Sequence, residues 1–261
     1  MAATEFSYGC RHAPDTFPLT GGPYRIAAER RLCADELRAV AEAEHRLAGL
    51  GALRAGALDM GVLPVDGVPA GALPVDAPAE ALPWSRALPP DELTALAQDL
   101  ADGLRGSART GHPAVFANEL AAWRATAEAA ARPGWAATLR GPFTTTRTEL
   151  TCPGPLLRGH LPDDGLKPAH PELRAVWDQL LHEHPAGAAT AWSEVMSEPL
   201  KLDCLRTPLR GALGTATIGG RELEHWAYRG ADGLRLWYAP DPVARETWVT
   251  GLAGPLPARR R

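Results

Sequence analysis

The sequence predicts an α+β protein, with helices in the N-terminal half and an antiparallel sheet packed against helix in the C-terminal half. Segments before residue 185 are rich in Ala, Leu, Glu and Arg and place apolar residues at helical spacing. From residue 199 onward, short runs of strand-forming residues are separated by tight-turn residues, which is typical of an antiparallel meander. With 261 residues, the chain is long enough for one large or two small domains.

The first predicted region, residues 1–89, is irregular apart from one helix. Turn-forming residues are frequent in residues 1–23. Residues 24–50 are rich in Ala, Glu, Arg and Leu, and their spacing predicts an amphipathic helix. In residues 51–90, Pro and Gly are frequent and the tetrapeptide LPVD occurs twice. Because this composition breaks helices and sheets alike, we expect a linker or an extended arm there.

Residues 90–135 are predicted to form a helical hairpin. Prolines followed by acidic residues suit the first turn of a helix at residue 90. The residues Arg-Thr-Gly-His-Pro at 109–113 end this helix, and a second Ala-rich helix follows. We expect the second helix to end at the residues Arg-Pro-Gly at 132–134.

The C-terminal half is predicted to be a helix followed by strands. Short strand-like pieces separated by Pro and Gly fill residues 136–170. Residues 170–184 place Leu and Trp side chains on one face of a short helix. The later strand-like runs meet at turns such as Gly219-Gly220. We therefore predict that residues 199–252 form one antiparallel sheet, with the helix 171–184 packed on it.

The net charge argues against one function class. A net charge of −4 and a pI of about 6.1 do not suit a globally basic nucleic-acid binder, although a local basic patch is compatible with them. Arg is abundant, whereas Lys167 and Lys201 are the only lysines. We attribute this bias to a GC-rich coding sequence of actinobacterial type, so Arg content alone is weak support for RNA binding.

The cysteines and the apolar runs bear on the cell compartment. Cys10, Cys33, Cys152 and Cys204 are far apart and form no CxxC pair, so we expect reduced, structural thiols. No apolar run reaches the roughly 18–20 residues that a membrane helix needs. The first residues lack the basic start and apolar stretch of a secretory signal. We therefore expect a cytoplasmic protein without a membrane partner.

One stretch of the C-terminal half carries a more specific pattern. A strand with a central Arg is followed by an Asp-containing turn, a hydrophobic strand and a basic tail: Gly233-Leu234-Arg235-Leu236-Trp237-Tyr238, Asp241, Thr247-Trp248-Val249-Thr250 and Arg259-Arg260-Arg261. This pattern resembles the central hairpin of toxins of the RelE/ParE superfamily. The preceding residues LRTPLRG resemble the strand before that hairpin, and a helix followed by three or four meander strands is the family's architecture. The resemblance covers about residues 170–261, within a predicted toxin-like domain at 150–261.

The resemblance implies the toxin of a toxin–antitoxin system, which inhibits growth through ribosome-associated cleavage of mRNA. The expected targets are therefore the ribosome and mRNA. An endoribonuclease of this class uses no metal and no cofactor, so fixed cations must hold the negative charge that develops on the phosphate. Arg is suited to this role because its planar fork pairs with two phosphate oxygens at once.

Strand alternation predicts which side chains would meet RNA. It places Arg235 and Trp237 on one face of the sheet and Leu234, Leu236 and Tyr238 on the other. If the leucines face the core, Arg235 lies on the exposed concave face, where the resemblance places a phosphate-contacting arginine. We expect other arginines to join it, Arg210 as a further catalytic cation and the following as RNA contacts: Arg229, Arg259, Arg260 and Arg261.

The sequence departs from the family in its acid–base residues. Active ribonucleases of the family usually keep a Tyr or His shortly after the last strand, and the residues GLAGPLPARRR contain neither. Three alternatives stay open. His225 or Tyr228 supplies the acid–base group, or the domain acts on a non-nuclease target such as gyrase, or it is inactive.

The helical hairpin suggests a partner. Residues 90–130 loosely resemble the helical segment of small actinobacterial antitoxins, with an Arg-Thr-Gly break and a second helix that carries Trp-Arg-Ala-Thr-Ala-Glu. An antitoxin-like segment fused ahead of a toxin-like domain would mask that domain. The expected partner is therefore a separate antitoxin protein or this intramolecular helical segment.

Two other function classes compete with the toxin. One is a non-enzymatic interaction or regulatory protein that kept the fold and lost the chemistry. The other is an enzyme with a His/Asp metal site, for which the candidates are His160, Asp163, Asp164, His170, His182 and His184. We predict no metal at the last two, because positions two apart on a helix point away from each other. The motifs GxGxxG, GxSxG, HExxH and the P-loop are absent, which removes most support for nucleotide-cofactor and hydrolase functions.

Overall fold

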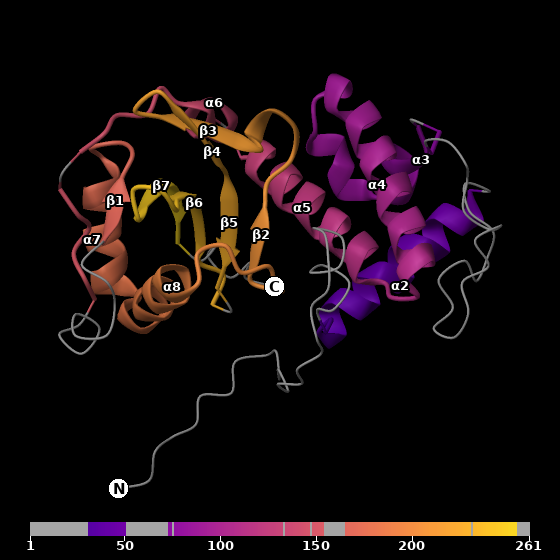
Figure 1. Ribbon diagram of the computed structural model, residues 1–261, viewed down its shortest axis with the longest axis horizontal. Coiled ribbons are helices and arrows are strands. Elements are labelled where there is room, and N and C mark those ends of the chain that lie inside the picture. Colours follow the sequence, from indigo (N-terminus) through magenta and orange to yellow (C-terminus); the bar gives the residue numbers. More distant parts are fainter. Residues whose placement is uncertain are drawn as a thin grey trace, which may run out of the picture. The chain divides into compact units, whose positions relative to one another are not determined.

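The computed structural model describes residues 31–50, 73–74, 76–132, 134–146, 148–153, 165–230 and 232–254. These residues form an α+β protein, as predicted (Figure 1). The chain divides into two compact units between Ala131 and Arg132. Within the ranges given above, no helix combines the length and the apolar character that crossing a membrane requires.

The described part of the first unit is helical. Helix α2 (Ala34–Gly49) lies within the helix predicted at residues 24–50. Helices α4 (Pro90–Thr110) and α5 (Ala114–Ala130) confirm the predicted hairpin. A proline and acidic residues begin α4, as helix starts favour. Gly111 ends it with a φ of 68°, a left-handed conformation that glycine adopts at little cost.

Two short helices correct the linker prediction for residues 51–90. Helix α3 (Asp76–Ala81) and the 3₁₀ helix η2 (Pro83–Ala87) occupy the end of that range. Proline is tolerated in a first helical turn, and the neighbouring Ala and Leu side chains pack against the other helices. Helices from the predicted region 1–89 thus share one core with the hairpin, and its buried side chains include Leu47, Ala81, Leu82, Leu96, Leu100, Phe116 and Trp123. The irregular start at residues 1–23 and residues 51–72 of the predicted linker lie outside the described residues.

The second unit contains a five-stranded sheet in the order β1-β7-β6-β5-β2. Its strands are β1 (Leu166–Pro168), β2 (Arg206–Pro208), β5 (Trp226–Arg229), β6 (Arg235–Asp241) and β7 (Glu246–Ala253). β1 pairs with β7 in parallel, and every other neighbouring pair is antiparallel. Parallel strands need a long connection. The segment of chain between β1 and β7 is long and includes the helices α7 and α8.

The prediction of one antiparallel sheet over residues 199–252 is wrong in two respects. β1 adds a parallel strand from outside that range. In addition, β3 (Thr215–Ile218) and β4 (Arg221–Glu224) form a separate antiparallel hairpin. Gly219 and Gly220 close this hairpin with φ values of 59° and 78°, which allow a tight turn that most other residues resist.

Different elements cover the two faces of the main sheet. Helices α7 (Leu173–Glu183) and α8 (Pro185–Ser197) pack on one face (Figure 1), so the prediction of a helix at 171–184 packed on the sheet is confirmed. The core between helices and sheet includes Trp177, Leu180, Trp192, Val195, Tyr228, Leu236, Tyr238 and Val249. Helix α6 (Trp135–Arg140) and the β3–β4 hairpin contact the other face.

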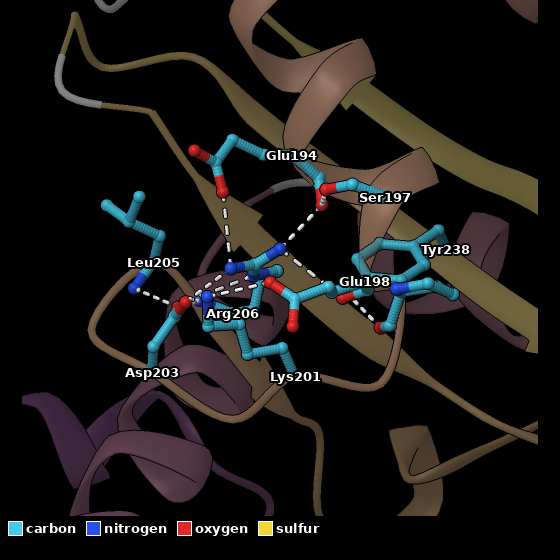
Figure 2. A network of polar contacts seen from close by, with 9 residues as sticks. Glu194, Ser197, Glu198, Lys201, Asp203, Leu205, Arg206 and Tyr238 are labelled. Atoms are coloured by element: carbon cyan, nitrogen blue, oxygen red, sulfur yellow. Dashed lines mark hydrogen bonds and ion pairs between the residues drawn. The ribbon is translucent and has the colours of Figure 1, made fainter. Parts of the chain in front are cut away.

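A buried arginine joins α8 to the edge strand β2 (Figure 2). The Arg206 side chain is 1% exposed, and its Nε and Nη2 donate to Asp203 Oδ2. Its Nη1 donates to the carbonyls of Glu194 and Glu198 at the C-terminal end of α8, where helix carbonyls lack partners and a cation is favourable. Burial disfavours the Arg206 charge, but the bonds and charge of Asp203 outweigh it and raise the pKa of Arg206. The network therefore holds the first residue of β2 against the helical layer.

Candidate nucleic-acid interface

Two of the predicted arginines lie directly opposite each other on neighbouring strands. Arg229 of β5 is the register partner of Arg235 of β6, and both are half-buried. Leu234 and Leu236 are fully buried against the helices, so alternation puts Arg235 and Trp237 on the face away from α7 and α8, as predicted. The opposed positions bring two positive charges together on this face of the sheet.

An arginine and two tryptophans form a cluster beside Arg235 on the same face. The Trp135 ring of α6 lies 4.5 Å from the Trp237 ring between centroids, with the planes tilted by 49°. The Arg132 guanidinium lies 5.5 Å from the Trp135 centroid and 5.6 Å from the Trp237 centroid. Both distances are within the range of cation–π attraction. We call Arg132, Trp135 and Trp237 the tryptophan cluster.

The tryptophan cluster depends on a glycine of β7. Gly251 is the register partner of Trp237, and α6 packs directly over it. A Cβ at Gly251 would lie 2.7 Å from Cζ3 of Trp135 and 2.9 Å from Cδ2 of Leu139. Both distances are too short for carbon atoms, so the absence of a side chain at Gly251 lets α6 bring Trp135 onto the sheet.

Several buried polar groups of this face lack a hydrogen-bond partner among the described residues, and they include the side chains of Trp237, Thr207 and Trp248. Trp237 is 2% exposed, and its indole Nε1 has no acceptor. The hydroxyl of Thr207 is also unsatisfied, and Thr207 and Trp237 pair with the same residue, Ala227, from opposite sides. Buried polar groups are normally satisfied, and leaving one unpaired costs about 1–3 kcal/mol.

Arg210 does not join the arginine pair. It precedes the 3₁₀ helix η3 (Gly211–Leu213) and follows Pro208, which pairs with Trp226 at the start of β5. Arg229 lies at the other end of β5, and three residues of strand separate the two ends by roughly 10 Å. The backbones of Arg210 and Arg229 therefore lie near opposite ends of β5.

His225 is enclosed in the protein. It is fully buried, with Nδ1 3.0 Å from the carbonyl of Leu213 and Nε2 2.6 Å from the hydroxyl of Thr250. A carbonyl only accepts, so Nδ1 carries the proton and Nε2 accepts from Thr250. Burial lowers the pKa of His225 to about 4, against a weaker opposing effect of the Leu213 carbonyl. In this position the imidazole cannot exchange a proton with a ligand on the sheet face.

Tyr228 lies on the wrong side of the sheet for the predicted role. It pairs with Leu236, and both side chains are buried in the core beneath α7 and α8. Burial raises the pKa of the Tyr228 hydroxyl well above its usual range, and the carboxylate of Glu194 adds to this effect. Tyr228 therefore lies on the opposite face from Arg235, and His225 is enclosed, so neither side chain is exposed beside Arg235.

The remaining candidates show no metal centre among the described residues. The predicted RNA contacts of the tail and part of the predicted metal loop lie outside the described residues: Arg259, Arg260, Arg261, His160, Asp163 and Asp164. His170 lies against the Phe143 ring, and its Nε2 is 3.3 Å from the carbonyl of Thr138. His182 and His184 are at the C-terminal end of α7. Within the part of the chain that is described, no three His, Cys, Asp or Glu side chains could hold a metal ion together.

The arrangement can bind an anion next to a flat aromatic surface. Arg229 and Arg235 supply positive charge, and the tryptophan cluster supplies two rings and a third guanidinium. Sequence reasoning finds Arg229, Arg235 and Trp237 but misses Arg132 and Trp135. The signal for the last two is the segment Arg-Pro-Gly-Trp at 132–135, which reads as the end of a helical hairpin. Only the tertiary contact of α6 with β7 shows that it belongs to this face.

Comparison with known proteins identifies no relative of this chain. No family model, no curated protein and no solved structure matches the chain.

Proposed function

We propose that the second unit is a toxin-like domain of the RelE/ParE type that inhibits growth by acting on RNA during translation. The observation that carries the proposal is the arginine pair, Arg229 and Arg235, beside the tryptophan cluster on one face of the sheet. The order of elements also supports it. Helices α7 and α8 precede the antiparallel strands β2, β5, β6 and β7, which is the helix-then-meander order that the resemblance implies.

The chemistry of this face suits RNA. Guanidinium groups pair with phosphate oxygens, and aromatic rings stack on bases, so a surface with both can follow an RNA strand. The net charge of −4 does not oppose this, because Arg132, Arg229 and Arg235 lie on one face and a local group of cations can act independently of the net charge. Arg235 is the residue that we assign to phosphate contact, with Arg229 as its neighbour.

A second function is favoured by one observation. His225 and Tyr228, the predicted acid–base residues, are both buried and therefore not available to a ligand beside Arg235. A domain without an acid–base group would hold its target without cleaving it. The alternative is therefore a non-enzymatic interaction or regulatory protein that kept the fold, binds a partner through its helical half and does not inhibit growth.

Substitution of Arg235 tests the proposal. Arg235→Ala should abolish growth inhibition in an inducible expression assay, because one charge-assisted contact to a reacting phosphate is worth roughly 10²–10³ in rate. The fold should survive, since a half-exposed strand arginine contributes little to stability. The matched control is Arg174→Ala, which removes the same charge from an exposed position on α7, on the other side of the sheet. It should inhibit growth like the wild type.

A second variant separates folding from function. Leu236→Asp places a carboxylate in the core beneath the helices and should unfold the unit, as circular dichroism would show. A folded Arg235→Ala protein that still inhibits growth would refute the assigned role of Arg235. If neither the full chain nor residues 132–261 inhibits growth, the toxin proposal is wrong and the interaction protein replaces it. RNA cleavage in a translation extract shows whether a chain that inhibits growth acts as a nuclease.

A further inference from the structure

Helix α6 contributes to the proposed RNA face although it lies outside the stretch that resembles the toxins. Its residues, Trp135–Arg140, precede the predicted domain at 150–261. Trp135 is half-exposed, whereas its partner Trp237 is 2% exposed. The inner side of the Trp135 ring rests over Gly251 and against the Trp237 ring. The sheet therefore holds this indole in a fixed orientation while part of it remains in contact with solvent.

The position of Arg132 adds a cation to this surface. Its guanidinium is within 5.6 Å of both ring centroids, so it can pair with a phosphate while a base lies on the neighbouring indole.

We infer that the tryptophan cluster is a stacking subsite for one unpaired nucleobase. The inference rests on the proposed function and deepens it, because it predicts a preference for single-stranded RNA. Bases in a duplex are stacked on each other and cannot offer a flat face to Trp135. Phosphates are present in both forms, so Arg229 and Arg235 contact both. The subsite should therefore discriminate between strands and duplexes, whereas the arginine pair should not.

Binding of the full chain to two RNA probes tests this. The probes are a short fluorescein-labelled RNA without self-complementarity and the same strand annealed to its complement, followed by fluorescence anisotropy. Trp135→Ala should weaken binding of the single strand about 5-fold to 100-fold, because a base–aromatic stack contributes that much affinity. Duplex binding should change less than about 2-fold. Trp135→Phe should restore most of the affinity, since a flat ring remains.

The controls distinguish the subsite from the arginine pair. Arg235→Ala should weaken single-strand and duplex binding alike, and Phe143→Ala, which alters another half-exposed aromatic of the same unit, should weaken neither. If Trp135→Ala does not fold, Trp135→Leu keeps apolar contact over Gly251 and gives the same comparison without a flat ring. Single-strand binding that is unchanged without the ring, or lost equally with duplex binding, would overturn the subsite and leave the proposed function intact. A wild-type chain that binds neither probe would overturn both.

Discussion

His225 illustrates how burial changes the chemistry of a residue that sequence reading assigns to catalysis. Both ring nitrogens are engaged inside the protein, by Leu213 and by Thr250, and the ring is neutral near pH 7. Thr250 belongs to the irregular position of β7 opposite Trp237 and Tyr238, where the register shifts. The imidazole therefore links the base of the β3–β4 hairpin to this irregularity, which is a structural role.

This burial predicts a pH dependence of stability. An unfolded histidine takes up a proton near pH 6.5, whereas folded His225 does so only near pH 4. Between these values the unfolded state binds more protons, so the free energy of unfolding falls as the pH falls. From pH 7 to pH 5 the loss from this group should be about 2 kcal/mol. Urea unfolding at the two pH values would measure it.

The matched variant for this prediction is His225→Asn, which does not titrate. It should be less stable than the wild type at pH 7, because it cannot make both hydrogen bonds with the same geometry. It should also lose less stability between pH 7 and pH 5, because the contribution of residue 225 is absent. The other titrating groups are the same in both proteins. An identical pH dependence in the two proteins would show that His225 is not buried in its neutral form.

At the scale of the elements, the position of α6 depends on a single residue of β7, Gly251. Gly251→Ala would force Trp135 and Leu139 away from β7. We expect a loss of about 1–3 kcal/mol in the free energy of unfolding, the usual cost of an added methyl group in a packed contact. We also expect weaker binding of single-stranded RNA, because Trp135 would no longer pack over residue 251 and against Trp237. A variant with unchanged stability and unchanged binding would show that α6 does not rest on Gly251.

Elements with a strong local pattern are those that the sequence predicts. The α4–α5 hairpin, the helix that packs on the sheet and the alternation around Arg235 all follow from periodicity and turn residues. Strand β1 has only three residues, Leu166–Pro168, and no local pattern marks a parallel partner that lies some eighty positions later. The burial of His225 and Tyr228 is likewise a tertiary effect. The candidate site was therefore half predictable: its strand arginines could be found, and its α6 residues could not.

For the molecule as a whole, the division at residue 131 sharpens the hypothesis of a fused toxin–antitoxin pair. If residues 90–130 mask the toxin-like unit, residues 132–261 expressed alone should inhibit growth more strongly than the full chain. The cut belongs at 132 and not at 150, because Trp135 and Leu139 pack within the second unit. Growth curves under matched expression would measure the difference. Equal inhibition by the two proteins would contradict masking.

The position of β7 in the sheet also determines when the sheet can form during protein synthesis. β7 lies between β1 and β6, yet a ribosome makes it after every other strand of this sheet. Until residues 246–253 have left the exit tunnel, β1 has no partner, one edge of β6 is open and the glycine beneath α6 is missing. The RNA face proposed for this unit is thus assembled only when translation of the sheet is finished. A chain whose synthesis stops earlier would lack that face, so under the toxin proposal such an incomplete chain should not inhibit growth.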